Sequence, residues 1–170
     1  AGVPGVRVVH AAFADLDAIM DVEQRAYPIP WTRLNFADIL AHPAQYAIQL
    51  LWDERLPDAP PSLIGYFVVM QGVQEAHLLN IAVHPDYQGQ GWSVFLLRQL
   101  CYWALWHQAR QVWLEVRTSN PHAHRVYERF GFRAVGRRKN YYPAVGGGRE
   151  DAIVMCCMLD APSDSSLDGC

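Results

Sequence analysis

The spacing of hydrophobic residues predicts four helices. Residues 14–26 form the first, because apolar side chains recur at helical intervals until prolines interrupt the pattern. Thr32 is a suitable N-cap for a second helix that ends near residue 42. The third includes the apolar run 94–106, and the fourth spans 121–131. The residues spaced by helical turns in the first helix are Leu16, Ile19, Met20 and Glu23.

Seven other segments have the pattern of β-strands. One of them, 76–83, is almost continuously apolar, which is typical of a strand buried on both faces. Strands alternating with helices indicate an α/β or α+β fold, with a mixed sheet covered by helices on both faces. We expect one domain over residues 1–160 and a flexible tail at 161–170. The predicted strands are 6–11, 45–52, 63–71, 76–83, 111–117, 132–142 and 151–159.

Composition excludes several classes of protein. Of the 170 residues, 51% are hydrophobic, enough for a substantial core, and the net charge of −3 leaves no basic surface for nucleic acid. The apolar run 94–106 is too short for a membrane span and is interrupted by Arg98 and Gln99. We therefore expect neither nucleic acid nor membrane as a partner.

Cysteine and histidine positions do not suggest a metal site. Cys101, Cys156, Cys157 and Cys170 lack the spacing of metal ligands, and the seven histidines show no such spacing either. Because the sequence starts without a signal peptide pattern, we expect a reduced, cytoplasmic protein.

The turn at residues 84–91 raises the question of function. Gly89 and Gly91 lie between a buried strand and a long helix, where glycine lets the backbone approach a ligand closely. The first N–H groups of that helix have no intrahelical partners and attract anions. Residues 88–93 can therefore bind a phosphate through backbone groups, although an ordinary tight turn would have the same glycines. The dinucleotide-binding fingerprint is not met, since no third glycine and no acidic residue follow at the required distances.

The order of motifs resembles the GNAT family of N-acetyltransferases. An apolar strand, Gln-x-x-Gly-x-Ser at 88–93, "WLEVR", "SNP" and "VYERFGF" follow one another as in that family. "VEQRAYPIPWT", "LNIAVHPDYQGQG" and "RRKNYYP…GREDAIVM" are similar to the bacterial subgroup that acetylates the N-terminal alanine of a ribosomal protein. The resemblance covers about residues 7–159. It implies a mostly antiparallel sheet with a splayed parallel pair of strands at its centre.

The resemblance also implies acetyl-coenzyme A as co-substrate. Its pantetheine arm would pair with the strand at 81–83, and its pyrophosphate would bind at 88–94. Ser93 stands where the family has glycine or alanine, and Gly89 stands where many relatives have a basic residue. The residues expected to bind it are Ile81, Ala82, Val83, Gln88, Gly89, Gln90, Gly91, Trp92, Ser93, Val94 and Asn120.

Two residues are candidates for proton transfer. Glu115 lies mid-strand between apolar neighbours, where an unpaired buried carboxylate would be costly. It therefore forms an ion pair with Arg117 or another arginine, or it acts as a general base, directly or through water. Tyr127 is either a core residue or, as the resemblance implies, the acid that protonates the departing thiolate. Asn120 is a helix N-cap, a ligand of the cofactor arm, or both.

The expected substrate follows from the same resemblance. Tyr27, Trp31, Tyr141 and Tyr142 would line a groove for the N-terminal peptide of small-subunit ribosomal protein eighteen, whose alanine would be acetylated. Glu150 and Asp151 would attract a basic peptide. Two alternatives remain: an acetyltransferase for a small amine such as an antibiotic or polyamine, and an acyl-coenzyme A binding protein without turnover.

Overall fold

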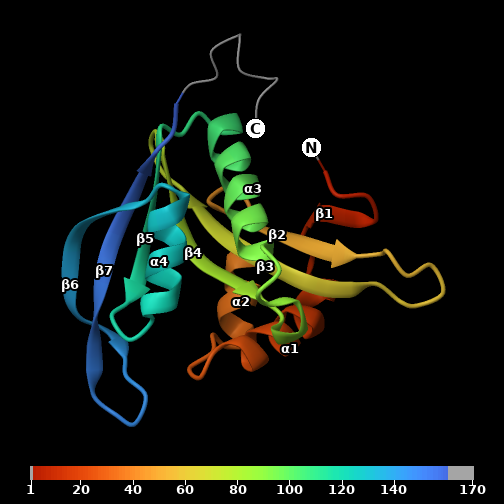
Figure 1. The fold of residues 1–170 in the computed structure, drawn as a ribbon, viewed down its shortest axis with the longest axis horizontal. Coiled ribbons are helices and arrows are strands. Elements are labelled where there is room, and N and C mark those ends of the chain that lie inside the picture. The colour runs from red at the N-terminus through yellow and green to blue at the C-terminus, as the bar shows by residue number, and fades with distance from the viewer. Residues whose placement is uncertain (1, 161–170) are drawn as a thin grey trace.

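A computed structural model describes residues 2–160, so the predicted tail at 161–170 lies outside the described residues. The described strands form one sheet in the order β1-β2-β3-β4-β5-β7-β6 (Figure 1). The strands are β1 (Val6–His10), β2 (Tyr46–Asp53), β3 (Ser62–Gln71), β4 (Glu75–Val83), β5 (Gln111–Arg117), β6 (Arg133–Pro143) and β7 (Arg149–Met158). The α-helices are α1 (Leu16–Ala26), α2 (Arg33–Leu40), α3 (Trp92–Trp106) and α4 (Pro121–Phe130), and short 3-10 helices cover Phe13–Asp15 and Pro85–Tyr87.

Side-chain caps explain where the first two helices begin. The Asp15 carboxylate accepts the N–H of Ala12 at 2.8 Å, so the chain first makes a 3-10 turn and α1 begins only at Leu16. Thr32 Oγ1 accepts the N–H of Asn35 at 3.2 Å, and this confirms the predicted N-cap of α2. The predicted helix ended near residue 42, whereas α2 ends at Leu40.

The centre of the sheet contains a parallel pair of strands that separate along their length. β4 and β5 pair only where residues 75–78 of β4 face residues 111–114 of β5. A bulge in the β3–β4 pairing leaves Leu79 without a partner, and bulges bend strands. β5 stays paired with β7 over its whole length. The prediction of a mostly antiparallel sheet with a splayed parallel pair is confirmed.

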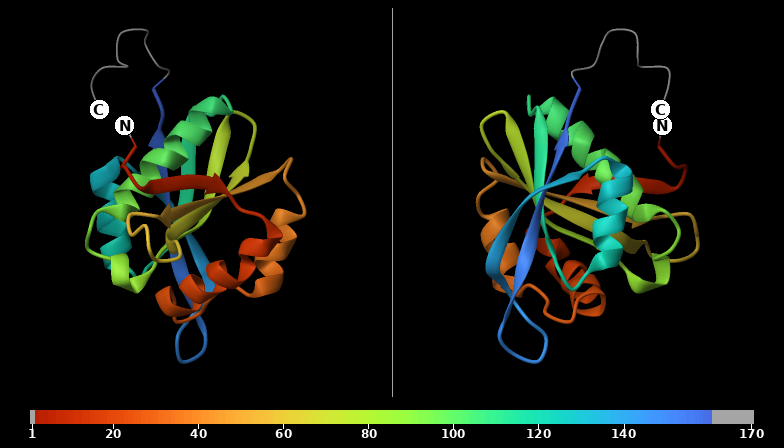
Figure 2. Two further views of the ribbon diagram at one scale, coloured as in Figure 1. Left: turned by 90° about the vertical axis from the view of Figure 1, so that its right-hand side faces the viewer. Right: turned by 60° about the vertical axis from the view of Figure 1, so that its left-hand side comes forward.

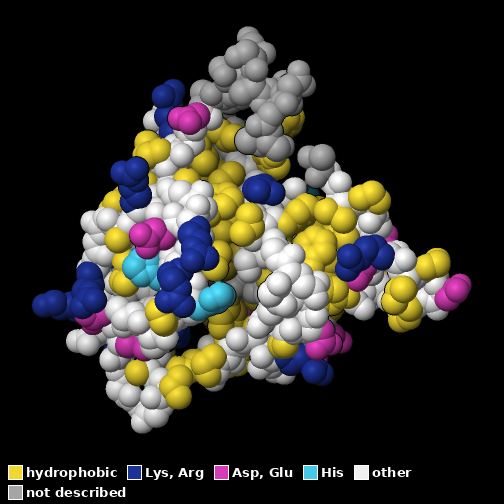
Figure 3. Space-filling model, viewed as in Figure 1, with side chains coloured by type: hydrophobic (Ala, Val, Ile, Leu, Met, Phe, Trp, Pro, Cys, Tyr) yellow, Lys and Arg dark blue, Asp and Glu magenta, His cyan; other side chains and the backbone are white. Residues whose placement is uncertain are grey.

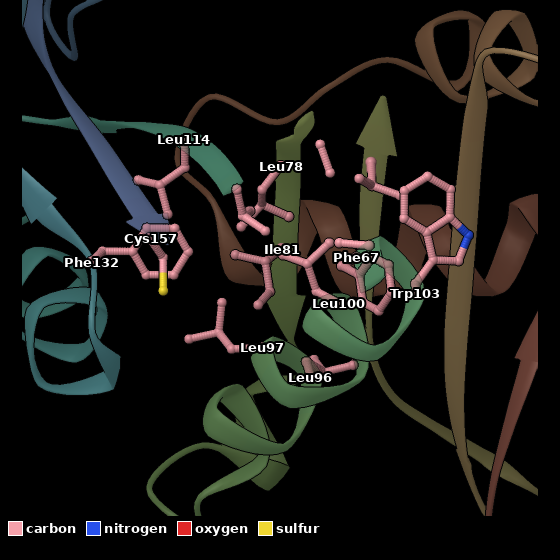
Figure 4. Close-up of a cluster of buried hydrophobic side chains, with 14 of the residues drawn as sticks. Phe67, Leu78, Ile81, Leu96, Leu97, Leu100, Trp103, Leu114, Phe132 and Cys157 are labelled. Carbon is pink, nitrogen blue, oxygen red and sulfur yellow. The ribbon is translucent and has the colours of Figure 1, made fainter. Parts of the chain in front are cut away.

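Helices cover both faces of this sheet. In Figure 1, α3 and α4 lie in front of the sheet and α1 and α2 lie behind it. Figure 4 shows the front cluster, in which side chains of α3 pack against those of β3, β4 and β5. Its labelled members are Phe67, Leu78, Ile81, Leu96, Leu97, Leu100, Trp103, Leu114, Phe132 and Cys157. The cluster behind the sheet includes Leu16, Ile19, Phe36, Leu50, Tyr66 and Val68. The two clusters hold β4 between them, as expected for a strand with an almost continuous apolar sequence.

The β6–β7 hairpin extends beyond the rest of the sheet, and both views in Figure 2 show its turn projecting from the molecule. Residues 144–148 form this turn. Within residues 2–160, no helix is both long enough and apolar enough to cross a membrane.

Candidate active site

Two cavities meet where β4 and β5 separate. The turn cavity has a volume of about 260 Å³ and is lined by the end of β4, the 88–93 turn and the start of α4. The carboxylate cavity has a volume of about 340 Å³ and contains Glu23 and Glu115 in its wall. Residues that line both cavities are Tyr27, Ile81, Asn120, Ala123 and Tyr127. These shared walls place the two cavities next to each other at the gap in the sheet.

The turn cavity depends on glycine at two positions. Gly89 and Gly91 have φ angles of 75° and 87°, a left-handed conformation that side chains with a Cβ rarely adopt. Gly91 is the residue immediately before α3, so its conformation directs the unpaired N–H groups of the first helical turn. The amide of Gln88 donates to the Val83 carbonyl at 3.0 Å and ties the turn to β4. The positive φ angles therefore explain why glycine occupies both positions.

The edge of β4 that faces the gap carries free backbone donors. The Tyr27 hydroxyl donates to the Ile81 carbonyl, and Gln88 donates to the Val83 carbonyl, so both carbonyls point toward the gap. In an antiparallel strand the N–H and C=O of one residue point the same way, so the N–H groups of Ile81 and Val83 also face the gap. Pairing with β5 ends at Leu78. An extended ligand can therefore pair with β4 as a short additional strand.

Positive charge gathers beside the turn cavity. Figure 3 shows arginine and histidine side chains over α4, whose sequence includes His122, His124, Arg125 and Arg129. His122 lines the turn cavity itself. We did not predict His122 as a site residue. Its position two residues after Asn120, at the start of α4, could have indicated that it lies beside the cavity. An anionic ligand in the turn cavity would therefore meet helix N–H groups on one side and basic side chains on the other.

Glu115 is one of two carboxylates in the wall of the carboxylate cavity. Its side chain is 6% exposed, and its Oε2 is 2.6 Å from His77 Nε2. Its Oε1 is 3.4 Å from Arg138 Nε. The expected ion pair is thus made with another arginine and not with Arg117, which instead lies 3.4 Å from Glu150. Glu115 also lines the cavity, so its contacts with His77 and Arg138 do not remove it from the site.

Glu23 is a second buried carboxylate, and we did not predict it as a site residue. It is 1% exposed and accepts hydrogen bonds from the Tyr66 hydroxyl, the Asn80 amide at 3.1 Å and the Trp31 N–H at 3.0 Å. Its hydrogen bonds join α1 to β3, β4 and the segment before α2. Glu23 therefore holds Trp31 in the wall of the cavity.

Tyr127 and Asn120 lie at the junction of the two cavities. Burial raises the pKa of Tyr127 to about 12, so the phenol keeps its proton throughout the neutral range. Asn120 Oδ1 accepts the N–H of Ala123 at 3.1 Å, which confirms the expected N-cap of α4. Asn120 also lines both cavities, so capping does not remove it from the site.

The hairpin contributes one of its two tyrosines to the cavity. Tyr142 lines the carboxylate cavity, its hydroxyl donates to the Glu115 carbonyl at 3.1 Å, and burial raises its pKa. Tyr141 is 39% exposed, and its ring lies 5.3 Å from the Arg138 guanidinium, outside both cavities. Glu150 is bonded to Ser119 and Asp151 to Asn140. Both acids are thus already engaged within the protein, which weakens the expectation that they attract a basic peptide.

The structure brings most of the predicted residues together. Tyr27 and Trp31 line the carboxylate cavity, and Tyr27 lines the turn cavity as well. The predicted cofactor residues that line the turn cavity are Ile81, Ala82, Val83, Gln88, Gly89, Ser93 and Asn120.

The predicted cofactor residues that line neither cavity are Gln90, Gly91, Trp92 and Val94. Trp92 as a whole is only 9% exposed and is part of the front hydrophobic cluster. Within residues 2–160, no cluster of three or more His, Cys, Asp or Glu side chains is arranged to hold a metal ion.

Comparison with known proteins agrees with this geometry. The sequence profile of the Acetyltransferase (GNAT) family matches residues 16–132, and the chain belongs to this family. It is 37% identical over 145 residues to the ribosomal protein bS18-alanine N-acetyltransferase of Haemophilus influenzae, covering 85% of this chain and 93% of that protein. It is 39% identical over 142 residues to the corresponding enzyme of Escherichia coli K12, covering 83% and 89%.

Solved structures give the same result for the fold. The crystal structure of the ribosomal-protein-S18-alanine N-acetyltransferase from Escherichia coli superimposes with a TM-score of 0.79 at 33% identity, covering 94% of this chain and 97% of that one. Ard1 from Thermoplasma volcanium has a TM-score of 0.77 at 20% identity and shows the fold alone.

Proposed function

We propose that this chain transfers the acetyl group of acetyl-coenzyme A to the N-terminal alanine of ribosomal protein bS18. The observation that carries the proposal is its identity of 37–39% to enzymes named for that reaction, over more than four fifths of the chain. We place the reaction in the cytoplasm, where ribosomal proteins are made.

The turn cavity and the edge of β4 fit acetyl-coenzyme A. The N–H groups of Ile81 and Val83 would donate to the amide carbonyls of the pantetheine arm. The backbone of residues 88–94, with His122 nearby, would hold the pyrophosphate. Asn120 would hold the arm at the junction. When bound there, acetyl-coenzyme A supplies an activated acetyl thioester.

Proton transfer would be divided between the two candidate residues. A peptide α-amine has a pKa near 8 and arrives mostly protonated at neutral pH. Glu115 accepts this proton, directly or through water, and leaves a neutral amine as nucleophile. Tyr127, which lines both cavities and keeps its proton at neutral pH, donates to the thiolate that departs. As the new C–N bond forms and the C–S bond breaks, the nitrogen would lose its second proton, which would replace the one that Tyr127 gave to the thiolate.

The carboxylate cavity would hold the first residue of the peptide. Tyr27, Trp31 and Tyr142 form its aromatic walls. Tyr141, on the projecting hairpin and partly exposed, would contact residues further along the peptide.

Mass spectrometry of acetylated peptides tests the proposal. The purified chain is incubated with acetyl-coenzyme A and a peptide carrying the N-terminal sequence of bS18. We expect acetylation of the α-amine, and no acetylation of the same peptide when its N-terminus is blocked beforehand.

Two other outcomes would contradict the proposal. Acetylation of spermidine or an aminoglycoside but not of the peptide would assign the chain to small amines. Binding of acetyl-coenzyme A without turnover on any amine would show that it is an acyl-coenzyme A binding protein.

A further inference from the structure

His77 lies against Glu115 but outside the cavity wall. It belongs to β4, where it pairs with Trp113 of β5 and Met70 of β3, and its side chain is 24% exposed. Its Nε2 is 2.6 Å from Glu115 Oε2. Since a carboxylate only accepts, Nε2 must carry the hydrogen in this contact. The imidazole thus donates a short, charge-assisted hydrogen bond to the carboxylate.

The two oxygens of Glu115 have different surroundings. Oε2 is occupied by His77, whereas Oε1 has an ion-pair contact of 3.4 Å with Arg138 Nε. That contact is too long for a strong hydrogen bond, so Oε1 keeps lone pairs for an amine or a water molecule. His77 therefore restrains the orientation of the carboxylate and leaves Oε1 as the oxygen with free lone pairs.

We propose that His77 is a positioning residue for Glu115 and that its protonation state controls how basic Glu115 is. This inference rests on the proposed function, in which Glu115 accepts the proton of the amine. A neutral imidazole donates one hydrogen bond and leaves the carboxylate basic. A protonated imidazole brings a full positive charge to the same position and lowers the proton affinity of Glu115. Turnover should then fall as His77 takes up a proton.

The other charged and titratable groups facing this pair do not change charge near neutral pH. Arg138 stays protonated. Burial, with the nearby Glu115 charge as a second cause, raises the pKa of both Tyr141 and Tyr142. Met70 and Trp113, the cross-strand neighbours of His77, do not titrate. The imidazole in contact with Glu115 is that of His77.

Two substitutions separate hydrogen bonding from charge. His77→Leu removes the donor, and we expect kcat at pH 8 to fall roughly 10-fold, as for loss of a hydrogen bond to a charged group, with KM for acetyl-coenzyme A unchanged. His77→Gln keeps an amide N–H near the position of Nε2 but cannot titrate. It should restore kcat at pH 8 to within about threefold of wild type and flatten the acid side of the pH profile of kcat.

A double-mutant cycle with Glu115→Gln tests whether His77 acts through Glu115. If it does, His77→Leu costs nothing further once Glu115→Gln is present. An additive loss, or wild-type kcat and pH profile in His77→Leu, would overturn the inference. If Glu115→Gln is itself as active as wild type, the proposed base fails, whatever the result for His77. Circular dichroism and melting temperature of each variant distinguish loss of function from loss of fold.

Discussion

The turn cavity and the carboxylate cavity differ in the groups that their walls offer to a ligand. The wall of the turn cavity includes Gly89, which has a positive φ, and the edge of β4 with its free N–H groups, so backbone geometry dominates there. In the carboxylate cavity, charged and aromatic side chains form the wall, and single atoms such as Glu115 Oε1 have distinct surroundings. A substitution at the turn cavity should therefore change ligand affinity through the shape of the backbone. A substitution in the carboxylate cavity should change kcat through charge or proton transfer.

Replacing Glu115 should have the largest effect. Glu115→Gln keeps the size of the side chain but removes the general base, so kcat at pH 7 should fall by about 10²-fold or more. Titration calorimetry should show unchanged affinity for acetyl-coenzyme A, because the turn cavity is not altered. Turnover near the wild-type rate at pH 7 would reduce Glu115 to a structural ion-pair partner of His77 and Arg138.

Tyr127→Phe should have the next largest effect. Only the hydroxyl is lost, so the fold should persist while kcat falls on the order of 10- to 100-fold and KM changes less. Because burial raises the pKa of Tyr127 to about 12, the wild-type enzyme should show no alkaline loss of activity from this residue up to about pH 10. An unchanged kcat in the phenylalanine variant would exclude Tyr127 as the proton donor.

Gly91→Val tests whether ligand binding depends on the backbone conformation of the turn. A Cβ at Gly91 would meet no atom within 4 Å, so the substitution acts through its φ of 87° and not through a clash within the protein. A β-branched residue is strained in this conformation by about 1–3 kcal/mol, which should weaken acetyl-coenzyme A binding about tenfold as the turn relaxes. The measurement is calorimetric titration of a variant whose circular dichroism is normal. Unchanged affinity would show that this turn does not hold the pyrophosphate.

Ser93→Gly should have the smallest effect. Ser93 lines the turn cavity, and removing its side chain gives a bound phosphate more room. Glycine in the first turn of α3 costs a few tenths of a kcal/mol, so we expect affinity equal to wild type or at most about twofold better. The measurement is the Kd for acetyl-coenzyme A. Gly91→Val, which should weaken binding, serves as the comparison. A clear loss of affinity would mean that the serine hydroxyl itself contacts the ligand.

The sequence predicts the residues of this site that belong to local motifs. Gly89, Gly91 and Asn120 have roles that depend on a turn or a helix end, so their neighbours in the chain suffice to find them. Glu23 could also have been predicted, because its helical spacing with apolar residues places it on the buried face of α1. Its partners Tyr66 and Asn80 could not have been predicted, since they lie on strands that are distant in the sequence.

Features that depend on strand register could not be predicted. His77 meets Glu115 only because β4 and β5 pair in parallel with His77 opposite Trp113, and a one-residue shift would turn it to the other face. The extent of the splay depends on the bulge at Leu79, for which the sequence has no glycine or proline signal. Tyr141 was expected in the groove together with Tyr142, but adjacent residues of a strand face opposite sides and only Tyr142 lines the cavity.

If acetyl-coenzyme A binds in the gap between β4 and β5, the thermal stability of the protein should depend on its concentration. The N–H groups of Ile81 and Val83 are left for a ligand, so a bound pantetheine arm would join the two halves of the sheet. A ligand that binds only the folded state stabilises it by about 2.7 kcal/mol at one hundred times its Kd. The melting temperature should then rise with the concentration of acetyl-coenzyme A, and amide hydrogens along this edge should exchange more slowly with solvent. In a starved cell, the same protein would unfold more readily.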